Sequence, residues 1–204
     1  MEGKQTTKDR IEQVALELFA KKGYQSVSIR DIGKRVGIKE SSIYYHFENK
    51  QAIMDSLMDK IDLLIEKMRA GFDYEFNKAE EITEAAMCEV AVGFLKGYLL
   101  NPYVYPMLAF LVMEQMTDPK AYETYQRLVF ELPLAQQEKV FDEMMKRGFI
   151  KQNNPAVLAQ EYYAVIFLAF QKNCVGCQTT DEKINLACEE IRLNVRDIYQ
   201  KMKG

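Results

Sequence analysis

Apolar residues recur at helical spacing near the start of the chain, and residues suited to helix caps interrupt them. Ser28 precedes Ile29, Ile32 and Val36, which are spaced to share one side of a helix. Asp31 stands three residues after Ser28, so the two side chains can cap the start of the helix reciprocally. This pattern predicts a short helix that begins at Ser28.

A second short helix is predicted after Gly37, from about residue 39 to residue 47. At ~100° per residue, Ile43 and Phe47 share its inner side. Its other sides carry hydroxyl and phenol groups, on Ser41, Ser42, Tyr44 and Tyr45. Small hydroxyls let a helix approach the floor of the DNA major groove, where aromatic rings can contact thymine methyl groups. The two helices therefore predict a helix-turn-helix that reads DNA.

The chain beyond residue 50 is predicted to be helical throughout, and three helix starts are marked by a capping residue before proline. They are Asn101-Pro102, Asp118-Pro119 and Asn154-Pro155. Further helices are predicted from Asn49 to about Phe76, from about Lys78 to Leu100 and from the Thr179–Glu182 segment onward, which makes six. Pro133 is expected to kink or split the segment 119–147, and Gly148 to end it.

The last two predicted helices carry a large apolar surface. Apolar residues of the final helix recur at intervals of four and three, and the helix before it is apolar nearly all round. We expect both helices to pack against their copies in a second subunit as a four-helix interface. The expected interface residues are Tyr162, Ile166, Phe170, Ile184, Cys188, Ile191, Val195 and Ile198. The alternative is that both helices close the core of a monomer.

Charge is distributed unevenly along the 204 residues, whose formal net charge is -3. Residues 1–50 hold ten Lys or Arg and seven Asp or Glu, whereas the remainder holds seventeen and twenty-three. Positive charge is therefore concentrated in the segment predicted to meet DNA phosphates. No apolar stretch approaches the ~20 residues that cross a bilayer, and the N-terminus lacks a signal-peptide core, so a cytoplasmic location is expected without membrane association.

The N-terminal segment from about Ile11 to Leu57 resembles the TetR family of bacterial transcriptional regulators. The resemblance rests on Phe19-Ala-Lys-Lys-Gly23-Tyr24, Ser28-Ile-Arg-Asp-Ile, Val36-Gly-Ile, Ser42-Ile-Tyr-Tyr-His-Phe47 and Asn49-Lys50. It implies an all-α fold in which a three-helix helix-turn-helix DNA-binding domain, residues 1–50, is joined by a long helix to a helical domain for effector binding and dimerisation, residues 51–204. A homodimer would read a pseudo-palindromic operator.

The resemblance also implies which residues contact DNA. Ser28 and Arg30 would contact the backbone, and Lys39, Ser41, Ser42 and Tyr45 would face the major groove. Tyr44, His46 and Lys50 would bind phosphates, although Tyr44 could instead pack between helices. Glu40 could accept a hydrogen bond from cytosine or could favour the helix start through the dipole.

By the same resemblance, a small-molecule effector entering the body would move the helix from Asn49 to Phe76 and release a repressor from its operator. Met and aromatic residues in the body favour an apolar or amphipathic effector. The candidate lining residues are Met87, Phe94, Tyr98, Met107, Phe110, Met113, Tyr125, Phe130, Tyr163 and Phe167. Glu114 or Gln115 is a candidate polar anchor.

Two alternatives stay open beside an effector-responsive repressor. Cys174 and Cys177 form a CxxC pair, which occurs in redox and metal sites, but no second CxxC accompanies it and the single histidine, His46, is distant in sequence. Such a chain could be a redox- or metal-sensing regulator. It could also be a helical adaptor that has lost operator binding. An enzyme is not expected, because no catalytic constellation is present, and neither a cofactor nor a metal is expected.

Overall fold

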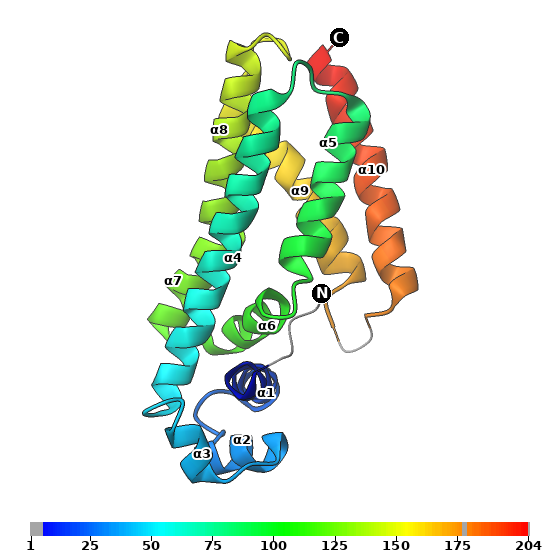
Figure 1. Ribbon diagram of the computed structural model, residues 1–204. Helices are drawn as coiled ribbons and strands as arrows, with labels where there is room; N and C mark the ends of the chain where they lie inside the picture. Colours follow the sequence, from blue (N-terminus) through cyan, green and yellow to red (C-terminus); the bar gives the residue numbers. More distant parts are fainter. Residues whose placement is uncertain (1–5, 177–178, 204) are drawn as a thin grey trace. The chain divides into compact units, whose positions relative to one another are not determined.

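The structure is a computed structural model that describes residues 6–176 and 179–203, and these residues are helical without strands (Figure 1). The helices are α1 Thr7–Lys22, α2 Ile29–Val36, α3 Glu40–Tyr44, α4 Lys50–Lys78, α5 Glu84–Phe94, α6 Val104–Glu114, α7 Pro119–Gln126, α8 Leu132–Lys146, α9 Pro155–Asn173 and α10 Asp181–Lys203, with π-helical segments η1 Leu95–Leu99 and η2 Arg127–Glu131. The predicted all-α class is confirmed. None of these helices combines the length and hydropathy needed to cross a bilayer.

The described residues form two compact units that are not simple halves of the chain. Unit 1 contains the chain up to Glu75 together with Asn101–Tyr125, and unit 2 contains Phe76–Leu100 together with the residues from Gln126 onward. Packing thus groups α6 and α7 with the N-terminal helices. The functional division into residues 1–50 and 51–204 stays a prediction, which these packing units do not test.

Helix α2 begins and ends as the sequence predicted. The Ser28 Oγ accepts the Asp31 N–H at 3.1 Å, and the Asp31 carboxylate accepts the Ser28 N–H at 3.0 Å. At the other end Gly37 has φ +82°, in the left-handed region, and its N–H donates to the Gly33 carbonyl. A side chain with Cβ at this position would strain the backbone by about 1–2 kcal/mol, so glycine suits this turn.

The core of unit 1 joins α1 to α4 and α6. Leu16, Phe19, Leu57 and Ile61 are fully buried. Helix α6 packs against α1, where the rings of Phe19 and Phe110 lie 6.2 Å apart. The hydrophobic surface of α1 is therefore covered in part by residues more than 80 positions away in sequence.

A charged cluster joins α1 to α4 inside unit 1. The Glu12 side chain is fully buried, and one of its oxygens accepts a 2.6 Å hydrogen bond from the Ser56 hydroxyl. The Lys60 ammonium forms an ion pair with the other Glu12 oxygen and a second one with Asp9 at 2.5 Å. A buried carboxylate requires such partners, because its isolated charge would cost several kcal/mol.

The hydrogen bonds from Lys60, and then from Thr6, lower the pKa of Asp9 from its ordinary value of 3.8 to about 2. A carboxyl group with a lower pKa in the folded state stabilises the fold above its unfolded pKa and loses this contribution as the pH falls through the folded pKa. The urea midpoint should therefore drop between about pH 4 and pH 2, and Asp9→Asn should make that drop shallower. The matched control is Asp59→Asn, an exposed carboxylate of α4. Parallel profiles for Asp9→Asn and the parent would contradict this account.

Unit 2 is built around α9, which packs against α8, α10 and η1, while α10 also packs along α5 (Figure 1). This explains why α9 is apolar nearly all round: several helices of its own chain cover it. The helix predicted from Lys78 begins instead at Glu84, where the Thr83 hydroxyl caps it by accepting the Ala86 N–H at 3.1 Å.

Of the three helix starts predicted at a capping residue before proline, two are confirmed and one is displaced. Asn154 and Asp118 precede α9 and α7 directly, as predicted, and each side chain accepts a backbone N–H of its helix. Asn101 accepts the Tyr103 N–H at 2.9 Å and caps a turn, so the helix begins three residues later, at Val104. The predicted end of α8 at Gly148 is confirmed, since Gly148 has φ +70° and its N–H donates to the Met145 carbonyl.

The predicted disturbance around Pro133 takes the form of the π-helical segment η2. Proline has no N–H, so it cannot donate to Val129 in an α register or to Leu128 in a π register. Two tyrosine hydroxyls fill these positions: Tyr163 donates to the Val129 carbonyl at 2.5 Å and Tyr98 to the Leu128 carbonyl at 2.9 Å. Both bonds are buried, so the two phenols satisfy the acceptors that proline leaves open.

The residues predicted at a subunit interface require a correction. Seven of the eight are buried within unit 2 of a single chain: Tyr162, Ile166, Phe170, Cys188, Ile191, Val195 and Ile198. They face α5, α8 and the neighbouring turns of α9 and α10, so their side chains cannot also cover a partner. The eighth, Ile184, is half-buried. The apolar spacing correctly predicted which face of α10 is buried. The helices that cover this face are α5 and α9 of the same chain, and not those of a second subunit.

Candidate nucleic-acid interface

Helix α3 presents aromatic side chains outward from a fixed inner side. Ile43 and Phe47 are 0% and 4% exposed, as their spacing predicted. Tyr45 is 85% exposed and Tyr44 is 53% exposed. Phenol rings that stay exposed to water contribute little to the stability of the fold, so both rings are available to a partner. The packing alternative for Tyr44 is not supported by this exposure.

The remaining predicted contacts divide by exposure. Arg30, Lys39 and Ser41 are exposed, whereas Ser42 and His46 are half-buried. The His46 ring lies edge-on to the Tyr45 ring, with 5.1 Å between the ring centroids. Ser28 is exposed, but its hydroxyl donates to the Asp31 carboxylate at 2.5 Å, so its side chain already serves the cap.

Lys50 has a structural role besides the predicted phosphate contact. Its ammonium donates to the backbone carbonyls of Tyr24 at 2.6 Å and Val27 at 2.9 Å, and it lies 4.1 Å from the centroid of the Tyr24 ring. Partial burial lowers its pKa. Lys50 therefore holds the loop between α1 and α2 against the start of α4, and its contact with DNA phosphate stays a prediction.

Two further residues shape the helix-turn-helix and were not identified from the sequence. Arg10 donates to the Val36 carbonyl at 2.8 Å and so satisfies the end of α2. A Cβ added to Gly33 would lie 3.0 Å from the Ile38 carbonyl oxygen and 3.4 Å from the Ile43 side chain. The absence of a side chain at Gly33 lets α2 and α3 approach closely. Neither role has a local sequence signal, because both depend on distant partners.

The predicted effector residues fall into both units. Met107, Phe110, Met113 and Tyr125 belong to unit 1, and Met87, Phe94, Tyr98, Phe130, Tyr163 and Phe167 belong to unit 2. Within unit 2, five of these form a connected aromatic cluster: ring centroids are 4.9 Å apart for Phe94 and Tyr98, 6.0 Å for Phe94 and Tyr163, 5.8 Å for Tyr163 and Phe167, and 5.5 Å for Phe130 and Phe167. Glu114, the candidate polar anchor, instead accepts the Tyr24 N–H at 3.1 Å within unit 1.

The predicted cysteine pair is described only in part, because Cys177 lies outside the described residues. Cys174 is fully buried, and burial raises the pKa of its thiol. A thiol with a raised pKa forms little of the thiolate that reacts with oxidants or binds metals. The described half of the pair therefore gives no support to sensing by this motif.

Comparison with known proteins identifies the N-terminal segment. Residues 11–57 match the model of the family described as bacterial regulatory proteins, tetR family. The biofilm operon icaADBC HTH-type negative transcriptional regulator IcaR of Staphylococcus epidermidis is 48% identical over 46 residues, which cover 22% of this chain and 25% of that protein. The matched segment thus spans about a quarter of the length of this curated relative.

Solved structures match along nearly the whole chain at low identity. A regulator assigned to the TetR family from Mesorhizobium loti MAFF303099 has a TM-score of 0.72 at 15% identity and covers 97% of each chain. The transcriptional regulator FadR from Bacillus subtilis, solved in complex with stearoyl-CoA, has a TM-score of 0.62 at 18% identity and covers 91% of this chain and 96% of its own. These matches establish the fold.

Proposed function

We propose that the chain, whose residues 11–57 match the model of the TetR family, is a transcriptional regulator, and more specifically a repressor, that binds a pseudo-palindromic operator as a homodimer and is released by an apolar or amphipathic effector. The single observation that carries operator binding is α3, which is anchored by Ile43 and Phe47 and presents Tyr44 and Tyr45 outward. The matched relative with a stated function is a negative regulator, which favours repression.

Exposed basic side chains accompany these tyrosines. Arg30, Lys34, Arg35 and Lys39 are exposed on or beside α2 and α3. Such charges favour DNA phosphates through counterion release, whereas tyrosine and serine side chains can contact base edges and thymine methyl groups. This difference between the basic and the hydroxyl-bearing side chains supports a DNA-binding head, residues 1–50, that contacts phosphates through α2 and base edges through α3.

The homodimer proposal is supported by a second apolar face on α9 and α10. Val157 and Leu168 of α9 are 44% and 66% exposed, and Leu186 and Leu193 of α10 are 46% and 69% exposed. The seven-residue spacing of Leu186 and Leu193, and the eleven-residue spacing of Val157 and Leu168, keep each pair on one side of its helix. These residues replace the buried set as the surface proposed to meet a second copy.

For the effector, the aromatic cluster of unit 2 offers the most suitable chemistry. Phe94, Phe130 and Phe167 are half-buried at its edge, so an apolar chain could insert among them with small side-chain movements. One solved structure of this fold holds stearoyl-CoA, an amphipathic acyl compound. Release then requires that the effector bind more tightly to the conformation with low operator affinity, and linkage makes operator DNA weaken effector binding by the same factor.

The proposal is tested by selecting bound sequences from random duplex DNA and measuring the affinity of the recovered operator. We expect a two-fold-symmetric motif with salt-sensitive affinity. Tyr45→Ala should weaken binding by about 1–3 kcal/mol, roughly tenfold to a hundredfold, because a base-contacting side chain is lost. Tyr74→Ala is the matched control, since Tyr74 is an exposed tyrosine of α4 outside the head.

The same assay separates the parts of the proposal. Recovery of an asymmetric motif would contradict dimeric reading, and equal affinities for Tyr45→Ala and the parent would contradict the assignment of α3. Adding stearoyl-CoA should reduce operator affinity if the aromatic cluster accepts acyl chains. Failure of this arm alone would reject the acyl effector and leave operator binding intact.

A further inference from the structure

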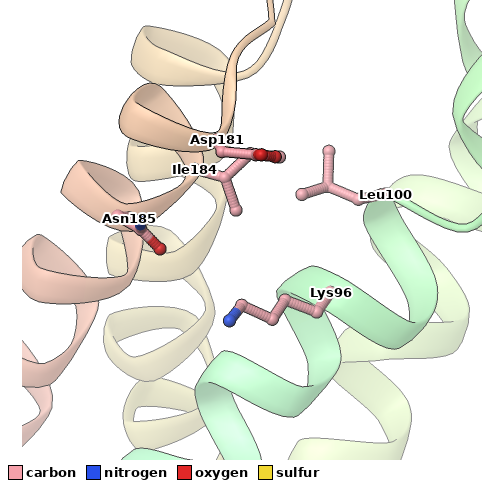
Figure 2. Close-up of a pocket in the computed structure, with 5 residues that line it drawn as sticks. All are labelled: Lys96, Leu100, Asp181, Ile184 and Asn185. Carbon is pink, nitrogen blue, oxygen red and sulfur yellow. The ribbon is translucent and has the colours of Figure 1, made fainter.

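A hollow of about 460 Å³ lies within unit 2 where η1 and the first turns of α10 face one another (Figure 2). Its lining residues are Lys96, Leu100, Asp181, Ile184 and Asn185. None of them belongs to the predicted effector residues. In Figure 2 the Lys96 side chain extends toward the side of Asn185, and the Asp181 carboxylate points into the space beside Ile184 and Leu100. The hollow is therefore lined by two opposite charges, an amide and two apolar side chains.

The position of the hollow follows from the pairing of α5 with α10. Glu84 pairs with Arg196 at 3.4 Å, and Glu89 pairs with Arg192 at 3.0 Å. As residue numbers rise in α5 they fall in α10, so the two helices are antiparallel. Continuing this register places Lys96 opposite Asn185 and Leu100 opposite Asp181. The first two opposed pairs, Glu84 with Arg196 and Glu89 with Arg192, are thus ion pairs. The next two pairs, at the hollow, do not combine opposite charges.

The mismatch leaves two charges without a partner among the residues that the structure describes. Among the described residues, neither the Lys96 ammonium nor the Asp181 carboxylate forms an ion pair or a side-chain hydrogen bond. The other charged side chains named above on the α5–α10 contact are paired. An exposed charge is stable in water by itself, but opposite charges on the two sides of one hollow, beside two apolar side chains, are complementary to a ligand that carries both charges and an apolar group.

We propose that this hollow binds a free α-amino acid with an apolar side chain. The carboxylate of the ligand would accept hydrogen bonds from the Lys96 ammonium and the Asn185 amide, and its ammonium group would donate to Asp181. Its side chain would lie against Leu100 and Ile184. The volume falls within the ~300–1,000 Å³ of small-molecule sites. This site is separate from the aromatic cluster, and its occupancy does not depend on operator binding.

Isothermal titration calorimetry with the 204-residue chain tests the proposal with L-leucine and two analogues that each lack one of its charges. L-leucine carries both charges, N-acetyl-L-leucine lacks the ammonium group, and 3-methylbutylamine lacks the carboxylate. We expect L-leucine to bind, and each of the other probes to bind about tenfold more weakly or worse, because each loses a charge-assisted hydrogen bond.

Variants assign the two charges to their partners. Lys96→Met and Asp181→Asn should each weaken L-leucine about tenfold or more. Asp181→Asn should also remove the advantage of L-leucine over N-acetyl-L-leucine, which shows that Asp181 recognises the ammonium group. Lys183→Met is the matched control, since Lys183 is an exposed residue of α10 outside the lining. Circular dichroism spectra would verify that each variant is folded.

Three results would overturn the proposal. L-leucine could fail to bind the parent chain, in which case Asp181 acts only on the dipole of α10 and Lys96 is merely solvated. All three probes could bind alike, which would indicate adsorption of the apolar group. Lys183→Met could weaken L-leucine as much as Lys96→Met, which would indicate a general charge effect. None of these results bears on the operator assay, so the two proposals fail independently.

Discussion

Lys60→Met is expected to lower the free energy of unfolding by about 3 kcal/mol, because it leaves the buried Glu12 carboxylate without a counter-charge. Glu12 is fully buried, and its remaining described partner would be the Ser56 hydroxyl at 2.6 Å. The methionine side chain preserves most of the apolar length of lysine, so the loss reports the charge and not a cavity. Urea unfolding followed by circular dichroism measures the effect.

A double variant separates loss of the ion pair from burial of an unpaired charge. Glu12→Gln in the Lys60→Met background should recover most of the lost free energy, since a neutral amide costs less to bury than a carboxylate. Lys67→Met, at an exposed position of α4, should change stability by less than about 0.5 kcal/mol. Equal destabilisation by Lys60→Met with and without Glu12→Gln would show that Lys60 acts through something other than Glu12.

Tyr163→Phe is expected to destabilise unit 2 by about 2 kcal/mol, because the buried Val129 carbonyl loses its donor and Pro133 cannot supply one. The phenylalanine ring can keep the stacked contact with Phe167, so packing changes little. Urea unfolding again gives the free energy, and near-ultraviolet circular dichroism verifies that the aromatic cluster remains ordered.

The explanation by Pro133 can be tested with a double-mutant cycle. Pro133→Ala introduces an N–H that can donate to Val129 or Leu128, so Tyr163→Phe should cost less than about 1 kcal/mol in that background. Tyr162→Phe serves as the control, since Tyr162 donates at 3.0 Å to the carbonyl of Met87 within the regular helix α5. Its cost should be the same with either residue at position 133. Independence of Tyr163 from Pro133 would contradict the proposed compensation.

Local features were predictable from the sequence because their partners are neighbours in the chain. The capping pair of Ser28 and Asp31, and the start of α9 at Asn154, need only residues within one turn. Local signals misplaced the helix start predicted near Lys78. The chain from Lys78 looked helical, but Thr83 caps α5 later, and Arg147 donates to the carbonyls of Phe76 and Ala79 at the end of α4. That arginine is about 70 residues away in sequence.

Features that depend on distant partners were predicted less well. The roles of Lys50 and Glu12 follow from contacts with other helices, which a charge pattern does not specify. The apolar face of α10 was found by its spacing, but spacing states that a face is buried and not which neighbour buries it. At the candidate interface, Tyr45, Ser41, Lys39 and Arg30 are exposed as required, whereas the bond from Lys50 to the loop between α1 and α2 had no signal in the sequence.

The inclusion of Asn101–Tyr125 in unit 1 limits how this protein can be recombined with its relatives. A chimera joined at residue 50 would transplant Phe19 without Phe110, whose ring lies 6.2 Å away, and Tyr24 without the Glu114 carboxylate that accepts its N–H. The transplanted piece would present a partly uncovered α1 to a foreign body. Engineers who exchange the N-terminal helices between regulators of this fold should therefore treat α6 as part of the exchanged module, although more than fifty residues of chain separate residue 50 from α6.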